Sequence, residues 1–333
     1  MSDALLGGSF VLSAAASLAA SWLLVSRLER VGARLELSEA LLGMLAAIAA
    51  DAPEIATAVT AVARGDRRIG TGVVIGSNLF NLAALLGLAA LIARRIALHR
   101  RVITLQGAVA LWICAVTVAA VTGACSPLVA LAAAVAVFAP YLAILGVRRE
   151  RLARSASGAS WRRWLLAAIA EEEVELEAAI SPRRGDARDA AMAGAAVLAV
   201  VAASIAMERI ASELGSRHAV PTIVLGALVL ASVTSLPNAV AAVYLAIRGR
   251  ATAVLSTALN SNALNVLAGL LLPMAVLGGS APSAQTSYLA ACYAALTVLA
   301  LALAHRQRGL RRGSGALIIA AYLGTVAVLL AAT

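Results

Sequence analysis

Two carboxylates and a proline, Asp51, Pro53 and Glu54, lie close together inside a long apolar stretch. If that stretch spans a membrane, each charge there costs roughly 2.5–3.5 kcal/mol on insertion scales, so buried acids of this kind indicate a functional site. A proline inside a helix lacks an N–H and clashes with the carbonyl four residues earlier, which here frees the carbonyl of Ala49. Lipid cannot satisfy a free carbonyl, so this segment must face protein or a hydrated cavity.

The same arrangement recurs 184 residues later in the chain, where Pro237 corresponds to Pro53. The other matches at this one offset are Arg64 and Gly65 with Arg248 and Gly249, Ser77 and Asn78 with Ser261 and Asn262, and Asn81 with Asn265. Chance agreement of this kind without a gap is improbable, so the sequence predicts an internal repeat.

Side-chain oxygens gather around both prolines and on the segment that follows each of them. The candidate cation ligands are Asp51, Glu54, Ser77, Asn81, Thr234, Ser235, Asn238, Ser261 and Asn265. Carboxylate, amide, hydroxyl and carbonyl oxygens are the ligands of hard cations such as Ca²⁺ and Na⁺, and the lack of nearby imidazole or thiolate argues against zinc or copper. Each Ser–Asn pair is spaced by four residues and therefore shares one helix face.

A second interpretation is that these serines and asparagines only join neighbouring helices by hydrogen bonds. It does not account for Asp51 and Glu54, because such contacts do not require charge. Asn78 and Asn262 lie one residue away from the predicted ligand face, and we expect them to brace the helices.

The composition predicts an all-α polytopic membrane protein. Hydrophobic residues make up 62% of the chain and charged residues only 13%, in apolar runs of about 20 residues separated by short arginine-containing segments. The net charge of +10 resides in these segments, which is the pattern of membrane topology and not of a nucleic-acid-binding groove. The three cysteines lack metal-ligand spacing.

Ten transmembrane helices are expected. They cover approximately 5–26, 38–63, 69–93, 102–123, 126–147, 189–210, 220–247, 252–277, 285–304 and 313–332. The segments 38–63 and 220–247 exceed the usual length, which fits helices that are tilted or interrupted at their prolines. Arginines concentrate in the odd-numbered connections, so the positive-inside rule predicts an inner (plasma) membrane protein with both termini outside.

A long fifth connection, 148–188, divides the chain into halves 1–147 and 189–333. Five helices on each side give the halves opposite orientations, so we expect two inverted five-helix repeats whose motifs lie at 40–90 and 223–272. The connection contains a basic, tryptophan-bearing segment followed by five glutamates between Glu171 and Glu177. We expect this amphipathic and acidic helix to lie on the inner membrane surface, and a regulatory cation sensor is the alternative.

These motifs resemble those of the sodium/calcium exchanger family of the calcium/cation antiporters. That family pairs a Gly-Thr-Ser-x-Pro-Glu stretch with a Gly-Ser-Asn-x-Phe-Asn stretch in each of two inverted repeats. Residues 76–81 match the second stretch in full, and 51–54, 234–238 and 261–265 match in part. The resemblance implies that Glu54 is a central ligand and that the first and sixth spans slide past the ligand-bearing core.

Two of the departures from the family pattern change the position of charge. Asn238 stands where the family usually has its second glutamate, and Asp51 stands where it has a serine. One acid is thus lost from the second repeat and one appears in the first, so both lie on one helix. Ala50 replaces a threonine and Asn260 replaces a glycine.

The resulting expectation is a secondary cation antiporter that exchanges Ca²⁺ for Na⁺ or H⁺. The alternatives are a Na⁺/H⁺ or other cation exchanger of the same fold, and a cation-binding membrane protein that does not transport. An enzyme is not expected, since no nucleophile–base pair or phosphate loop is present. We expect no cofactor and no nucleic-acid or protein partner, only membrane lipid and small cations.

Overall fold

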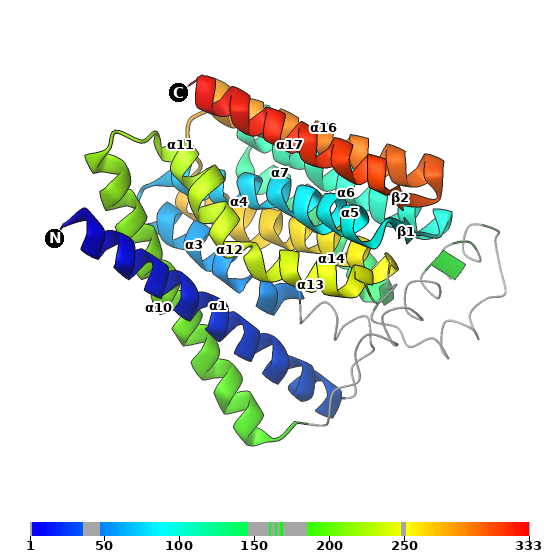
Figure 1. Cartoon of the computed structure of the whole chain (residues 1–333), viewed down its shortest axis with the longest axis horizontal. Helices are drawn as coiled ribbons and strands as arrows, with labels where there is room; N and C mark the ends of the chain where they lie inside the picture. Colours follow the sequence, from blue (N-terminus) through cyan, green and yellow to red (C-terminus); the bar gives the residue numbers. More distant parts are fainter. Residues whose placement is uncertain are drawn as a thin grey trace.

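The computed structural model describes residues 2–35, 47–145, 160, 164, 167–168, 185–247 and 251–332, and these residues form a bundle of long helices (Figure 1). The predicted membrane-surface helix of the fifth connection falls almost wholly outside the described residues. The same holds for the first part of the predicted span 38–63, of which the structure describes 47–63.

The first half contains α1 (Asp3–Arg34), α3 (Ala52–Ala63), α4 (Arg67–Asn81), the π-helical turns η1 (Leu82–Leu88), α5 (Ala89–Ala93), β1 (Arg95–Ala97), α6 (Arg100–Val121) and α7 (Pro127–Leu145). The second half contains α10 (Ala187–Arg217), α11 (Thr222–Val224), η2 (Leu225–Leu230), α12 (Ala231–Thr234), α13 (Leu236–Ile247), α14 (Ala251–Leu264), η3 (Asn265–Leu271), α15 (Leu272–Leu277), α16 (Ala284–Gln307), β2 (Gly309–Arg311) and α17 (Arg312–Ala331).

The offset of 184 relates the helices of the two halves along their whole length. It places the start of α1 on that of α10, both ends of α3 on those of α13, and the span Arg67–Ala93 on Ala251–Leu277. It also places the start of α6 on that of α16, and α7 and α17 correspond to within one residue at their starts. The predicted repeat therefore extends over the described helices of both halves.

Eight described helices are long and apolar enough to cross a membrane, and a ninth span is formed by 222–234 and α13 together, bent by 46°. The polytopic all-α prediction is confirmed, whereas the count of ten spans is not. Within the described residues, the second span is represented by four helical residues before Asp51 and the short α3 after it.

The helices that carry the prolines break at corresponding residues. Asp51 adopts φ −82° and ψ −4°, and Ser235, which lies 184 residues later, adopts φ −84° and ψ −1°. Each break lies two residues before the proline. The proline therefore falls in the first turn of the next helix, where its missing N–H removes no helical hydrogen bond. The breaks place polar residues of both repeats at the ends of helices inside the bundle.

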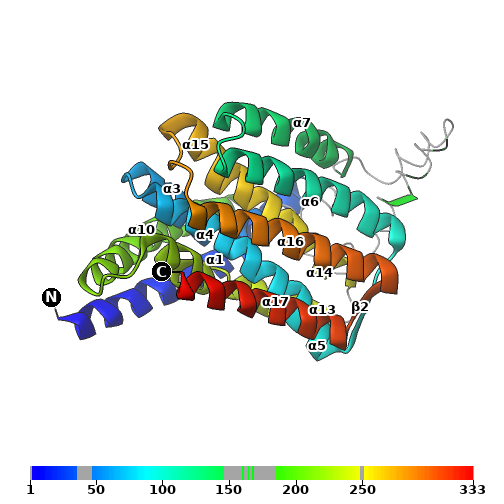
Figure 2. The same cartoon turned by 90° about the horizontal axis from the view of Figure 1, so that it is seen from above.

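The helix α4 lies at the centre of the bundle, and it contacts α3, η2, α16 and η3 (Figure 2). Its span, Arg67–Ala93, is the most deeply buried of the membrane-length helices. Close packing depends on Gly76, because a methyl group there would collide with the backbone carbonyl of Ala227 in η2. The glycine of the Gly76-Ser77-Asn78 motif thus lets two backbones approach in the core.

The helices α1 and α10 pack against each other along one side of the bundle (Figure 1). Ion pairs join them at both ends. At one end Arg27 Nη1 lies 2.8 Å from Asp189 Oδ1. At the other end Arg217 Nη1 lies 3.1 Å from Asp3 Oδ1, and the His218 ring lies 3.1 Å from Asp3 Oδ2. Corresponding helices of the two repeats are therefore direct neighbours.

Candidate functional site

The two acids found in the sequence meet the second repeat inside the bundle. Asp51 and Glu54 are both fully buried. The Asn238 side-chain nitrogen lies 2.7 Å from Asp51 Oδ1 and 3.3 Å from Glu54 Oε1, so one amide donates to both carboxylates. The Ser261 hydroxyl donates a second, short hydrogen bond to Asp51 Oδ1. These contacts join residues that are 184 to 210 positions apart.

Four asparagines connect the repeats next to the acids, in a pattern with two-fold symmetry. Asn78 Nδ2 donates to the Asn262 carbonyl at 3.0 Å, and Asn262 Nδ2 donates to the Asn78 carbonyl at 3.1 Å. Asn81 Nδ2 donates to Asn262 Oδ1 at 3.1 Å, and Asn265 Nδ2 donates to Asn78 Oδ1 at 3.4 Å. Asn78 and Asn262 therefore brace the two repeats, as expected, and orient Asn81 and Asn265.

Several buried oxygens of the site accept or donate no hydrogen bond within the described residues. They are Asp51 Oδ2, Glu54 Oε2, Thr57 Oγ1, Ser77 Oγ, Asn81 Oδ1, Ser235 Oγ and Asn265 Oδ1. A buried polar atom without a partner is costly and calls for a specific explanation. Because each of these atoms is an oxygen and two belong to carboxylates, the set suits a hard cation that completes their coordination.

The carbonyl of Ala49, which Pro53 leaves without its helical partner, accepts a hydrogen bond from a helix that is distant in the sequence. The Ser21 hydroxyl of α1 donates to the Ala49 carbonyl at 2.9 Å. The Ser204 hydroxyl of α10 donates to the carbonyl of Pro53 itself at 3.4 Å. The neighbouring helices α1 and α10 thus stabilise the helix break at which the two buried acids lie.

The predicted ligands do not all present a free oxygen. Asn238 points its nitrogen at the acids, whereas the sequence argument expected it to supply an oxygen. The Thr234 hydroxyl of α12 donates back to the carbonyl of Leu230, the last residue of the preceding η2, at 3.0 Å. Ser235 lies beside Glu54, and Ser77, Asn81, Ser261 and Asn265 are all buried in the same region.

Sequence reasoning missed Thr57, Ser21 and Ser204. Thr57 is buried three residues after Glu54 and therefore shares its helix face. This spacing was a signal that the sequence contained. The two serines belong to helices that are distant in sequence, and no spacing rule connects them with the proline break.

Two curated proteins match short parts of the chain. The putative antiporter CaxA of Alkalimonas amylolytica is 36% identical over 84 residues, which are 25% of this chain and 26% of CaxA. The inner membrane protein YrbG of Escherichia coli strain K12 is 46% identical over 57 residues, 17% of this chain and 18% of YrbG. The matched regions thus span about a quarter or less of these relatives.

Two exchangers of known structure share the fold over nearly the whole chain. The H⁺/Ca²⁺ exchanger CAX superposes with a TM-score of 0.70 at 16% identity, over 97% of this chain and 85% of CAX. The sodium-calcium exchanger NCX_Mj superposes with a TM-score of 0.59 at 19% identity, over 98% of this chain and 99% of NCX_Mj.

The family comparison covers most of both halves. Residues 5–148 and 190–331 match the family described as sodium/calcium exchanger protein, and they include all the site residues discussed above. With the helices that correspond at an offset of 184, the paired motifs and the shared fold of two exchangers, this match shows that the chain belongs to the sodium/calcium exchanger family.

Proposed function

We propose that this protein is a secondary antiporter that moves Ca²⁺ in exchange for Na⁺ or H⁺ by alternating access at the site around Asp51 and Glu54. The observation that carries the proposal is the pair of fully buried carboxylates, each with one oxygen that lacks a hydrogen-bonding partner among the described residues. A buried charge of this kind is costly unless a counter-charge can occupy the site.

We assign the ion ligands by the atoms that are left free. Asp51 Oδ2 and Glu54 Oε2 supply the negative charge, and Ser77 Oγ, Asn81 Oδ1 and Asn265 Oδ1 supply neutral oxygens. Thr57 Oγ1 joins this set because it is buried on the same helix. Ser235 Oγ is also buried without a partner among the described residues and joins the set. Thr234, Asn238 and Ser261 act as supporting residues in this conformation, and they are candidates for direct ligation when the site rearranges.

The charge of the site favours a divalent ion. At about 4 Å and an effective dielectric constant near 20, one carboxylate attracts a unit charge by roughly 4 kcal/mol, and a divalent ion by about twice as much. Two adjacent acids can also share a proton when no cation is bound, which offers a route to proton coupling. The printed descriptions of CAX and NCX_Mj, H⁺/Ca²⁺ and sodium-calcium exchange, support the same choice of ions.

Flux measurements in sealed vesicles test the proposal. Purified protein reconstituted into liposomes should accumulate ⁴⁵Ca²⁺ when an outward Na⁺ or H⁺ gradient is imposed, and not without a gradient. Glu54→Gln should abolish this uptake. Glu213→Gln is the matched control, because Glu213 is an exposed acid of α10 that pairs with Arg217 at the surface.

Folded protein that moves no cation under either gradient would exclude the proposal and favour a cation-binding membrane protein. Uptake of Na⁺ under a H⁺ gradient, with no competition by Ca²⁺, would instead favour a Na⁺/H⁺ exchanger of the same fold.

We place the protein in an inner (plasma) membrane with both termini outside, on the distribution of its arginines. Labelling of single cysteines near each terminus tests this orientation.

A further inference from the structure

The strands β1 and β2 form a small antiparallel sheet from the connections α5–α6 and α16–α17, at one end of the bundle (Figure 1). The central residues Ile96 and Leu310 are opposite each other and buried. The Arg312 N–H donates to the Arg94 carbonyl at 3.1 Å, and the Leu98 N–H donates to the Arg308 carbonyl at 3.2 Å, so the two connections are hydrogen-bonded along their whole length.

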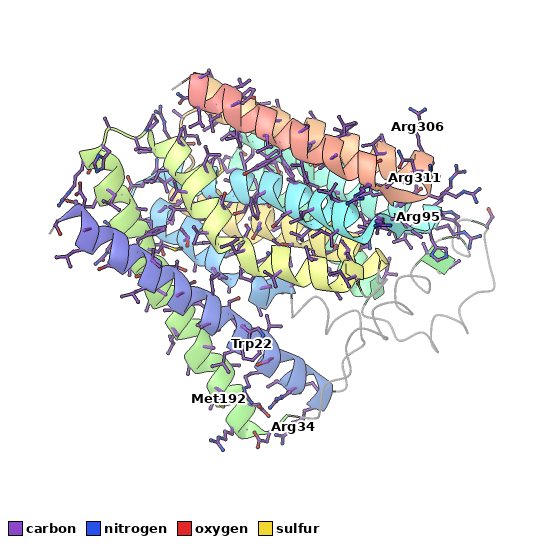
Figure 3. All side chains as sticks on the ribbon, in the orientation of Figure 1. Trp22, Arg34, Arg95, Met192, Arg306 and Arg311 are labelled. Atoms are coloured by element: carbon purple, nitrogen blue, oxygen red, sulfur yellow. The ribbon has the colours of Figure 1, made fainter. Side chains whose placement is uncertain are left out.

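The register of this sheet brings like charges together. Arg95 is paired directly with Arg311, and both side chains are exposed. Like charges opposite each other across an antiparallel pair are destabilising. Arg94, Arg308 and Arg312 are exposed beside them, and Figure 3 shows Arg95, Arg306 and Arg311 at the same end of the molecule.

Within the part of the chain that the structure describes, the helices and strands around this sheet supply no acid to relieve the repulsion. The sequence has no aspartate or glutamate between Asp66 and Glu150, nor any after Glu213. The elements that build the sheet therefore contain only positive charge. Among the described residues, no carboxylate forms an ion pair with Arg94, Arg95, Arg308, Arg311 or Arg312.

The position of the sheet between membrane-length helices leads us to expect it at the depth of the lipid headgroups. Both connections join membrane-length helices, namely Arg67–Ala93 with α6, and α16 with α17. Residues between the ends of such helices lie in the interfacial layer of the bilayer.

The arginines around the sheet are not part of the internal repeat. The residues 184 positions after 94–97 are Gly278, Gly279, Ser280 and Ala281, which carry no charge.

From these observations we infer that the sheet is a binding site for the phosphate headgroup of an anionic phospholipid. The paired guanidinium groups of Arg95 and Arg311 are the central contacts, since arginine binds phosphate in a bidentate manner. A headgroup phosphate between them replaces the repulsion with two attractive contacts. Basic clusters between membrane helices are known to bind anionic headgroups. This inference does not depend on the transported ion.

Lipid binding by the full-length protein in detergent tests the inference. Native mass spectrometry should show retention of cardiolipin or phosphatidylglycerol over phosphatidylcholine. The double variant Arg95→Gln/Arg311→Gln should bind the anionic lipid about 30-fold more weakly, at about fivefold for each arginine near the surface. Arg34→Gln, an exposed arginine at the end of α1, is the matched control and should bind like the unmodified protein.

Thermal unfolding in detergent separates a lipid site from a structural role of the two arginines. Without anionic lipid, the double variant should unfold at the same or a higher temperature than the unmodified protein, because the opposed charges are gone. A lower unfolding temperature would indicate an acidic partner within the chain and overturn the inference. Equal lipid retention by the double variant would overturn it as well, and stabilisation by inorganic phosphate or pyrophosphate alone would identify a soluble anion site instead.

Discussion

The side-chain nitrogen of Asn238 lies 2.7 Å from Oδ1 of Asp51. Asn238 occupies the position at which the resemblance places a glutamate, and Asp51 occupies the position of a serine. Asp51 thus places a carboxylate of the first repeat within hydrogen-bonding distance of the position at which the resemblance expects the acid of the second repeat. We propose that Asp51 takes the place of that acid.

If Asp51 takes the place of this acid, a carboxylate at position 238 should be able to replace the one at position 51. Asp51→Ser should weaken Ca²⁺ transport by about tenfold or more, since the lost attraction for a divalent ion amounts to several kcal/mol. The double variant Asp51→Ser/Asn238→Glu keeps the number of acids and should recover most of the activity. ⁴⁵Ca²⁺ uptake at several Ca²⁺ concentrations measures both effects. If the double variant is no better than Asp51→Ser alone, the two positions do not share one ion.

Glu54→Gln should separate ion binding from folding. The substitution keeps the shape of the side chain and removes a buried charge, so the protein without Ca²⁺ should be as stable as the unmodified protein or more so. Ca²⁺ at 100 times its dissociation constant should stabilise the unmodified protein by about 2.7 kcal/mol and the variant hardly at all. Thermal unfolding with and without Ca²⁺ measures this difference. An undiminished Ca²⁺ effect in the variant would place the ion away from Glu54.

The reciprocal amide bonds between Asn78 and Asn262 predict coupled stabilities. Asn78→Ala leaves the Asn262 carbonyl without its side-chain donor, and Asn262→Ala does the same to Asn78. Each single variant should lose about 1–3 kcal/mol, because a buried polar group loses its partner. The double variant should lose less than the sum of the two, as residues of one network are not additive. Strict additivity in denaturation experiments would contradict the shared network.

The offset of 184 and the two acids were available from the sequence, because motif spacing along a chain does not depend on how the chain folds. The bracing role of Asn78 and Asn262 followed from their position one residue off the ligand face. The offset also proved to hold for α6 and α16, where the sequence shows no shared motif. Hydrophobic helices can thus keep a repeat that their residues no longer reveal.

The orientation of the Asn238 amide was beyond sequence reasoning, since an asparagine has a donor and an acceptor at nearly the same place. Only the position of the two carboxylates decides which end faces them. The contacts of Ser21 and Ser204 depend on how α1 and α10 pack across the proline break, over separations of 28 and 151 residues. The strands β1 and β2 have three residues each, too few for an alternating pattern to appear.

The close approach of α4 and η2 gives a last prediction, on packing. A methyl group at position 76 would overlap the Ala227 backbone, which cannot move aside as a flexible side chain can. Gly76→Ala should therefore separate the two helices, lower the unfolding temperature and reduce Ca²⁺ transport, because Ser77 and Asn81 follow on the same helix. Gly194→Ala in α10 is the control, since a methyl group there meets no atom within 4 Å. There the substitution should leave transport unchanged and should stabilise the helix slightly, because alanine favours a helix over glycine by about 1 kcal/mol. Equal behaviour of the two variants would show that the contact between α4 and η2 does not limit the approach of the repeats.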